Sequence, residues 1–125
     1  MTENWLSLPF PPSVNAMYRN VSGKGRVKSA DYKKWEKQAG FLILEAKPRP
    51  HTGPVRISYT FGAKSGRWDM SNFIKAIEDL LVTHGLIEDD SAKIIKRFTV
   101  TQNPNLEGVL VRVTGGGIKE GEHDP

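Results

Sequence analysis

Apolar residues recur at helical spacing in two stretches of the chain, 30–47 and 69–84. In the first stretch the apolar positions that would share one helix face are Tyr32, Trp35, Ala39, Leu42 and Ala46. In the second stretch the corresponding positions are Phe73, Ile77, Leu80, Leu81 and His84. Ser29 is a suitable N-cap for the first helix, because its hydroxyl can accept a hydrogen bond from a free backbone amide. Gly85 is a suitable end for the second, since glycine adopts the left-handed conformation common there.

The remaining apolar pattern predicts four strands, at residues 5–10, 55–61, 92–102 and 109–113. Residues 55–61 show the two-residue period of a half-buried strand most clearly, because every second side chain from Val55 to Phe61 is apolar. The turn at 103–105 should join the last two strands as an antiparallel hairpin, since it is too short for a crossover. Residues 11–29 are expected to form a long loop, most flexible at 22–25.

These elements predict an α+β fold, a two-layer sandwich in which two helices cover a four-stranded mixed sheet, in the order β-α-β-α-β-β. A length of 125 residues fits one domain. We expect residues 1–114 to form this domain and residues 115–125, which begin with three glycines, to form a flexible polar tail.

Composition narrows the classes of protein. The absence of cysteine excludes disulfides and thiolate metal sites. The first ten residues lack the pattern of a signal peptide, and no stretch approaches the roughly 20 apolar residues of a membrane span. A soluble cytoplasmic protein with no membrane partner is therefore expected.

Positive charge is concentrated near the amino terminus. Residues 1–114 carry 17 basic and 11 acidic side chains, although the whole chain has a net charge of only +4. No acid occurs between Glu3 and Asp31, and the basic side chains in this interval are Arg19, Lys24, Arg26 and Lys28. An anionic partner such as nucleic acid would explain this distribution. A solvated basic loop without such a partner is the alternative.

Acidic residues stand at two points that the fold could bring together. Asp69 lies at the predicted start of the second helix. One interpretation is that it caps this helix and has no other role. Asp89 and Asp90 directly precede the third strand. The simpler interpretation of these paired acids is that they belong to a solvated turn and have no further role. If the two points meet at one end of the sheet beside Arg67 and Lys75, their hard oxygen ligands suit a magnesium ion facing phosphate.

Lys75 lies one helical turn after Ser71, on the polar side of the second helix. It could be a solvated lysine that pairs with Asp79. It could also place an ammonium group near a phosphate, where it would stabilise the charge that develops in a transition state. The helical spacing leaves both interpretations open.

Two motifs resemble a known family. Residues 69–75 read DMSNFIK and are followed by Gly85 and the doublet Asp89-Asp90, and residues 11–19 read PPSVNAMYR. Over about residues 5–113 this resembles the RusA family of Holliday junction resolvases, which are often carried by prophages. The family pattern is Asp-x-Asp-Asn, then a lysine three residues on, a helix ending in glycine, and a paired aspartate. Its earlier motif is Pro-Pro-Ser-x-Asn with Tyr-Arg shortly after.

The resemblance implies a magnesium-dependent endonuclease, with manganese able to substitute, that acts in DNA recombination and repair. As a homodimer it would cut a four-way junction by paired symmetric nicks. By position, Asp69 and Asp90 match metal-binding acids and Lys75 matches the catalytic lysine. Asp89 would bind the metal or orient a water molecule. Ser71 stands where the pattern has its middle acid, and is a neutral ligand at best.

Glu78 is a possible compensating acid, since it lies two turns after Ser71 on a similar helix face. The DNA-binding residues would be Asn15, Tyr18, Arg19, Lys24, Arg26, Lys28 and Arg67. Three alternatives remain open. They are a weakened or inactive branched-DNA-binding protein of the same fold, a nuclease for flaps or other branches, and an interaction protein that binds no metal.

Overall fold

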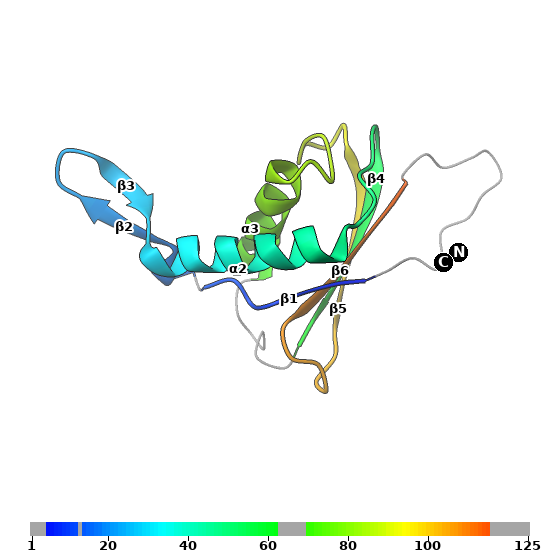
Figure 1. Cartoon of the computed structure of the whole chain (residues 1–125), viewed down its shortest axis with the longest axis horizontal. Coiled ribbons are helices and arrows are strands. Elements are labelled where there is room, and N and C mark those ends of the chain that lie inside the picture. The colour runs from blue at the N-terminus through cyan, green and yellow to red at the C-terminus, as the bar shows by residue number, and fades with distance from the viewer. Residues whose placement is uncertain (1–4, 13, 63–69, 116–125) are drawn as a thin grey trace.

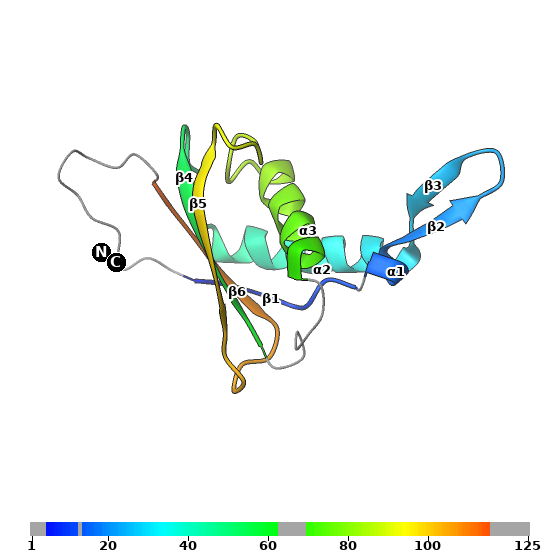
Figure 2. The same ribbon diagram turned by 180° about the vertical axis from the view of Figure 1, so that it is seen from behind.

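The computed structural model describes residues 5–12, 14–62 and 70–115. Its main sheet has four strands, in the spatial order β1 (Leu6–Leu8), β6 (Val109–Gly115), β4 (Val55–Phe61) and β5 (Ile95–Gln102). β4 and β5 run parallel, whereas β6 is antiparallel to both of its neighbours. The two long helices, α2 (Ala30–Ala46) and α3 (Met70–Thr83), lie on one side of this sheet (Figure 1 and Figure 2). The predicted two-layer α+β fold is confirmed.

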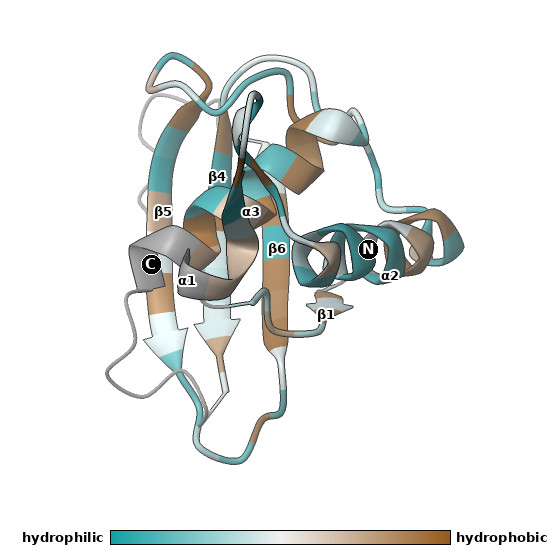
Figure 3. Cartoon of the chain, turned by 90° about the vertical axis from the view of Figure 1, so that its left-hand side faces the viewer, coloured by the Kyte–Doolittle hydropathy of each residue, from teal (hydrophilic) through white to brown (hydrophobic). Residues whose placement is uncertain are grey.

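The hydrophobic core lies between the sheet and the two helices, and Figure 3 shows α3 crossing the face of the sheet. Burial alternates along β4, as its sequence predicts, so that Val55, Ile57, Tyr59 and Phe61 face the helices. The predicted stripe on α3 is buried at Phe73, Ile77, Leu80 and Leu81. These two patterns form because one face of each element must leave water.

Helix α2 begins as predicted. The Ser29 hydroxyl accepts a hydrogen bond from the Tyr32 amide (3.1 Å) and donates one to the Ala16 carbonyl. Its buried face is shifted from the prediction, however, because Ala46 is exposed and Ile43 is buried in its place. Helix α3 ends at Thr83, and Gly85 has a φ of 73°, which confirms the predicted stop.

The prediction that residues 11–29 form a loop is wrong. A short helix, α1 (Val14–Met17), leads into a two-stranded antiparallel hairpin formed by β2 (Tyr18–Val21) and β3 (Gly25–Lys28). The hairpin projects away from the main sheet, beyond the start of α2 (Figure 1). Its tip turns at Gly23 and Gly25, which have φ values of 80° and 75°. Both strands are largely polar, so no apolar alternation marks them in the sequence.

Two details of the third predicted strand also differ. β5 begins at Ile95 rather than at residue 92, because residues 91–94 form a turn in which the Ile94 amide donates to the Ser91 carbonyl (3.0 Å). The last two strands run antiparallel but do not pair with each other, since β4 lies between them. The predicted hairpin is therefore wrong, although the turn near Asn103 is present and returns the chain to the other side of β4.

β6 continues to Gly115, one residue into the predicted tail, and residues 116–125 lie outside the described ranges. Among the described helices, none combines the length and the apolar character needed to cross a membrane.

Candidate active site

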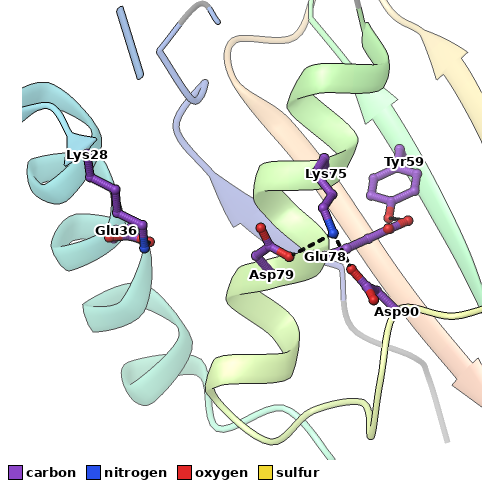
Figure 4. A network of polar contacts seen from close by, with 7 residues as sticks. All are labelled: Lys28, Glu36, Tyr59, Lys75, Glu78, Asp79 and Asp90. Carbon is purple, nitrogen blue, oxygen red and sulfur yellow. Dashed lines mark hydrogen bonds and ion pairs between the residues drawn. The ribbon is translucent and has the colours of Figure 1, made fainter. Parts of the chain in front are cut away.

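The polar side of α3 carries a lysine held between two carboxylates. The Lys75 Nζ lies 2.5 Å from Asp90 Oδ2 and 3.3 Å from Asp79 Oδ1 (Figure 4). Asp79 is one turn further along α3, whereas Asp90 belongs to the link between α3 and β5. The hydrogen bonds that the ammonium donates, first to Asp90 and then to Asp79, raise the pKa of Lys75 above its ordinary value of 10.5. The predicted pairing of Lys75 with Asp79 is confirmed, and its placement near a phosphate stays a prediction.

Folding of the link explains how Asp90 reaches α3. After Gly85 the chain is fixed by burial of Leu86 and Ile87 and by a hydrogen bond from the His51 amide to the Leu86 carbonyl (3.0 Å). The Glu88 carboxylate accepts a further hydrogen bond from the Gly53 amide (3.0 Å). These contacts anchor the residues just before Asp90, so the carboxylate of Asp90 is presented to the side of α3.

A third carboxylate, which belongs to α3, lies beside this pair. Glu78 accepts a hydrogen bond from the hydroxyl of Tyr59 on β4, with an oxygen–oxygen distance of 3.1 Å (Figure 4). Partial burial raises the pKa of the Glu78 carboxyl above its ordinary value of 4.5, and the Tyr59 hydrogen bond opposes that shift. The charge of Asp90 raises the same pKa further, which shows that the two carboxylates are electrostatic neighbours.

The two aspartates of the doublet Asp89-Asp90 lie in different environments. Asp90 is partly buried against Lys75, while Asp89 is exposed. A hydrogen bond from the Ser91 hydroxyl, followed by one from the Asp90 amide, lowers the pKa of the Asp89 carboxyl below 3.8. Asp89 therefore stays ionised, but Asp90 is the acid that faces α3.

Several predicted site residues cannot be compared with the structure. Asp69 and Arg67 lie outside the described ranges, as do the side chains of Asn15 and Ser71. Asp69 is the residue immediately before α3 in the chain, and Lys75 is the sixth residue of that helix. The predicted meeting of Asp69 with Asp90 therefore stays a prediction.

The described cluster suits a cation through the chemistry of its donors. Asp79, Asp90 and Glu78 supply only hard carboxylate oxygens, and the ammonium of Lys75 already lies between two of them. Oxygen ligands of this kind are those that magnesium takes in proteins. Within residues 5–12, 14–62 and 70–115 no group of three or more acidic or histidine side chains is arranged to hold a metal ion by itself.

The predicted DNA-binding residues mostly belong to the β2–β3 hairpin. Tyr18 packs edge-on against Tyr32 at the hairpin base, and the guanidinium of Arg26 lies 4.2 Å from the centre of the Tyr18 ring. Arg19, Lys24 and Arg26 are exposed. Lys28 differs, because it forms an ion pair with Glu36 on α2 (2.7 Å).

Electrostatics link the hairpin base to the cluster on α3. Burial raises the pKa of the Tyr32 hydroxyl, and the charges of Tyr18, Glu36 and Asp79 raise it further. Asp79 is thus near enough to Tyr32 to affect its ionisation. Figure 4 shows Glu36 of α2 with its partner Lys28 of β3, and Lys75 and Asp79 of α3.

A comparison with known families decides the identity of this arrangement. The sequence model of the family described as endodeoxyribonuclease RusA matches residues 9–114. The chain belongs to the RusA family. No curated protein sequence matches it. The RusA family is a family of endodeoxyribonucleases, and membership in it implies Holliday junction resolution. RusA nucleases in general depend on a metal ion.

The sequence did not indicate two features of the candidate site. Tyr59 appears in the sequence only as one more apolar position of a strand, and nothing local indicates that its hydroxyl meets Glu78. The secondary structure of the hairpin was also missed. The Pro-Pro-Ser-x-Asn motif directly before it was the signal that marked this region as functional.

Proposed function

We propose that this RusA-family chain is a magnesium-dependent endonuclease that resolves four-way DNA junctions by paired symmetric nicks, with manganese able to substitute. The observation that carries the proposal is the contact between Lys75 and Asp90 on the polar side of α3. These are two of the three residues whose positions match the catalytic lysine and metal-binding acids of the family. The third is Asp69.

In this proposal Asp69 and Asp90 hold the divalent ion, and Asp89 binds it or orients one of its waters. The bound ion would polarise the scissile phosphate and lower the pKa of the attacking water. Lys75 stabilises the negative charge that develops on the phosphate or gives a proton to the leaving oxygen. Lysine with its ordinary pKa is already protonated at neutral pH, and the contacts with Asp90 and Asp79 raise the pKa of Lys75 further, so the side chain carries the positive charge that stabilisation of the phosphate requires.

The β2–β3 hairpin is the proposed DNA contact. A two-stranded β-ribbon is narrow enough to enter the major groove of duplex DNA. The exposed cations Arg19, Lys24 and Arg26 supply sequence-independent attraction to phosphates. Arg67 and Asn15 keep their proposed DNA-binding roles from the sequence pattern alone. Lys28 is a weaker candidate, since Glu36 already neutralises it.

A homodimer fits the substrate. A four-way junction presents two equivalent strands to be cut, and a two-fold dimer would place one active site at each. Measuring the mass of the protein in solution by light scattering tests this part. A monomer that still makes paired nicks in one binding event would contradict it.

The substitution Asp69→Asn tests the nuclease proposal, with Glu45→Gln as a control that removes one exposed carboxylate at the far end of α2. Labelled four-way junction is incubated with each variant and Mg²⁺ or Mn²⁺. Asp69→Asn should abolish cutting and leave junction binding intact or tighter, because a charge that repels phosphate is removed. Equal loss of binding and cutting would make Asp69 a structural residue. Competition with flap, duplex and single-stranded DNA identifies the preferred substrate.

Ser71 favours the second candidate function, a branched-DNA-binding protein that cuts weakly or not at all. A junction-cleavage assay over a range of manganese concentrations separates the two. Ser71→Asp should raise cleavage or lower the metal requirement if this position belongs to the metal site. No change would place the side chain outside the coordination sphere.

Glu78 is the proposed compensating acid. Its carboxylate accepts a hydrogen bond from Tyr59 and its pKa is raised by the charge of Asp90, which supports a role in binding a metal-bound water. The test is Glu78→Gln in two backgrounds. Glu78→Gln should lower the cleavage rate in the natural Ser71 background and change it little in the Ser71→Asp background. Equal losses of cleavage rate in both backgrounds would contradict the compensating role.

A further inference from the structure

Lys75 lies where it can obstruct the site it serves. Its ammonium is 2.5 Å from Asp90 Oδ2, so it occupies one of the two carboxylate oxygens through which Asp90 could bind a divalent ion. One ammonium and one divalent ion in the same place repel each other. Binding of a metal ion to Asp90 through Oδ2 therefore requires Lys75 to move away.

The structure also contains the position to which Lys75 can move. Asp79 is four residues after Lys75 on the same helix, and its carboxylate already lies 3.3 Å from the ammonium. Such i, i+4 neighbours stay within reach of each other, because both are fixed to one helix face. The Lys75 side chain is 62% exposed, which leaves it room to change rotamer, whereas Asp90 is only 26% exposed.

We propose that Lys75 is an internal competitor for Asp90, and that Asp79 is a positioning residue that receives the ammonium when a divalent ion binds Asp90. This inference rests on the proposed nuclease function. In the metal-free protein the lysine keeps Asp90 neutralised on the side of α3. In the metal-bound protein Asp79 holds the lysine next to the site, where it can act on the phosphate, instead of releasing it to solvent.

Calorimetric titration of Mn²⁺ into the full chain, without DNA, tests the competition. An ion pair this exposed changes a binding constant by up to about fivefold. Lys75→Met should therefore tighten Mn²⁺ binding by about fivefold or more, since repulsion is removed as well. Asp79→Asn should weaken binding by about two- to fivefold, because the lysine then returns to Asp90. Glu45→Gln is the control and should leave binding unchanged.

The double variant Lys75→Met/Asp79→Asn separates positioning from simple loss of charge. If Asp79 acts through Lys75, the effect of Asp79→Asn disappears in the Lys75→Met background. If the effect persists, Asp79 attracts the metal directly and the positioning role is overturned. Thermal unfolding of every variant checks folding, and Lys75→Gln provides a second lysine variant.

Cleavage kinetics give a separate readout. At saturating Mn²⁺, Asp79→Asn should lower the single-turnover rate on a four-way junction without weakening junction binding, and Asp79→Glu should restore the rate. A rate equal to that of the natural chain would overturn the inference. Unchanged Mn²⁺ affinity in Lys75→Met, with affinity still lost in Asp90→Asn, would do so too while leaving the nuclease proposal intact. Absence of any Mn²⁺ binding and cutting would remove both.

Discussion

The hydrogen bond between Tyr59 and Glu78 ties the sheet to the acidic side of α3, and Tyr59→Phe removes it with little change in shape. Tyr59 is completely buried on β4, and its hydroxyl donates to Glu78 Oε2 over 3.1 Å. Hydrogen bonds to charged groups contribute about 1.5–3 kcal/mol to stability. Water can reach the half-exposed Glu78 and replace part of this bond. We therefore expect a loss of about 1–2 kcal/mol in the free energy of unfolding.

The pH dependence gives this prediction its sign. The pKa of Glu78 is raised in the folded protein, so the favourable contribution of its protonation is complete below about 4.5 and is lost as the pH rises through the folded pKa. Tyr59→Phe removes the hydrogen bond that opposes the shift, and the folded pKa should rise further. The destabilisation by Tyr59→Phe should thus be larger at about pH 8 than near pH 4.5.

Urea unfolding in the presence of a metal chelator measures both effects. A double-mutant cycle with Glu78→Ala isolates the pair from other consequences of the tyrosine substitution. A coupling free energy below about 0.5 kcal/mol, or a loss that grows toward acidic pH, would refute this account of the pair.

Three further predictions concern the stability of the fold and the binding of DNA. Ser29→Ala should lower the free energy of unfolding by about 1–2 kcal/mol in urea titration, because α2 loses its N-cap. Arg26→Ala should reduce the salt dependence of junction binding by nearly one unit of logarithmic slope, and Lys28→Ala by less, since Lys28 already has a carboxylate partner on α2. Gly108→Ala should destabilise more than Gly53→Ala in thermal unfolding. Both glycines have positive φ, but only at Gly108 would the new methyl group lie 2.6 Å from a backbone carbonyl oxygen.

The main sheet and the two long helices could be predicted because burial imposes a period on the sequence. Strand β4 alternates apolar and polar residues, and the polar residues remain partly exposed because both long helices of the described chain lie on the other face of the sheet. Helix α3 carries a continuous apolar stripe for the same reason. The shift from Ala46 to Ile43 on α2 shows the limit of this approach. Both residues extend plausible helical rows, and only the position of the helix against the sheet decides between them.

The β2–β3 hairpin could not be predicted from a hydrophobic period, because it buries no apolar face of its own. Its stability comes from the ladder between β2 and β3 and from aromatic contacts at its base, where Tyr18 meets Tyr32 and Arg26 covers Tyr18. Polar two-stranded ribbons have no characteristic hydrophobic period. Glycine at the tip then resembles the signal of a loop.

The candidate site divides in a similar way. The Lys75–Asp79 pair follows from i, i+4 spacing alone and was available from the sequence. The Lys75–Asp90 contact depends on how the link after Gly85 packs, which is fixed by burial of Leu86 and Ile87. Distant contacts of this kind need the folded chain, and the predicted meeting of Asp90 with Asp69 before α3 stays a prediction.

The charges of the molecule separate the binding of DNA from its cleavage. Three carboxylates and one ammonium meet on α3, so without a metal ion this cluster repels phosphate. The exposed cations of the hairpin attract phosphate without any metal ion. Junction binding should therefore depend chiefly on the hairpin and on salt, and cutting on a cation that reverses the local charge of the cluster. In the metal-free protein the ammonium of Lys75 neutralises part of this negative charge. The same residue would therefore act both before a metal ion binds and during cleavage.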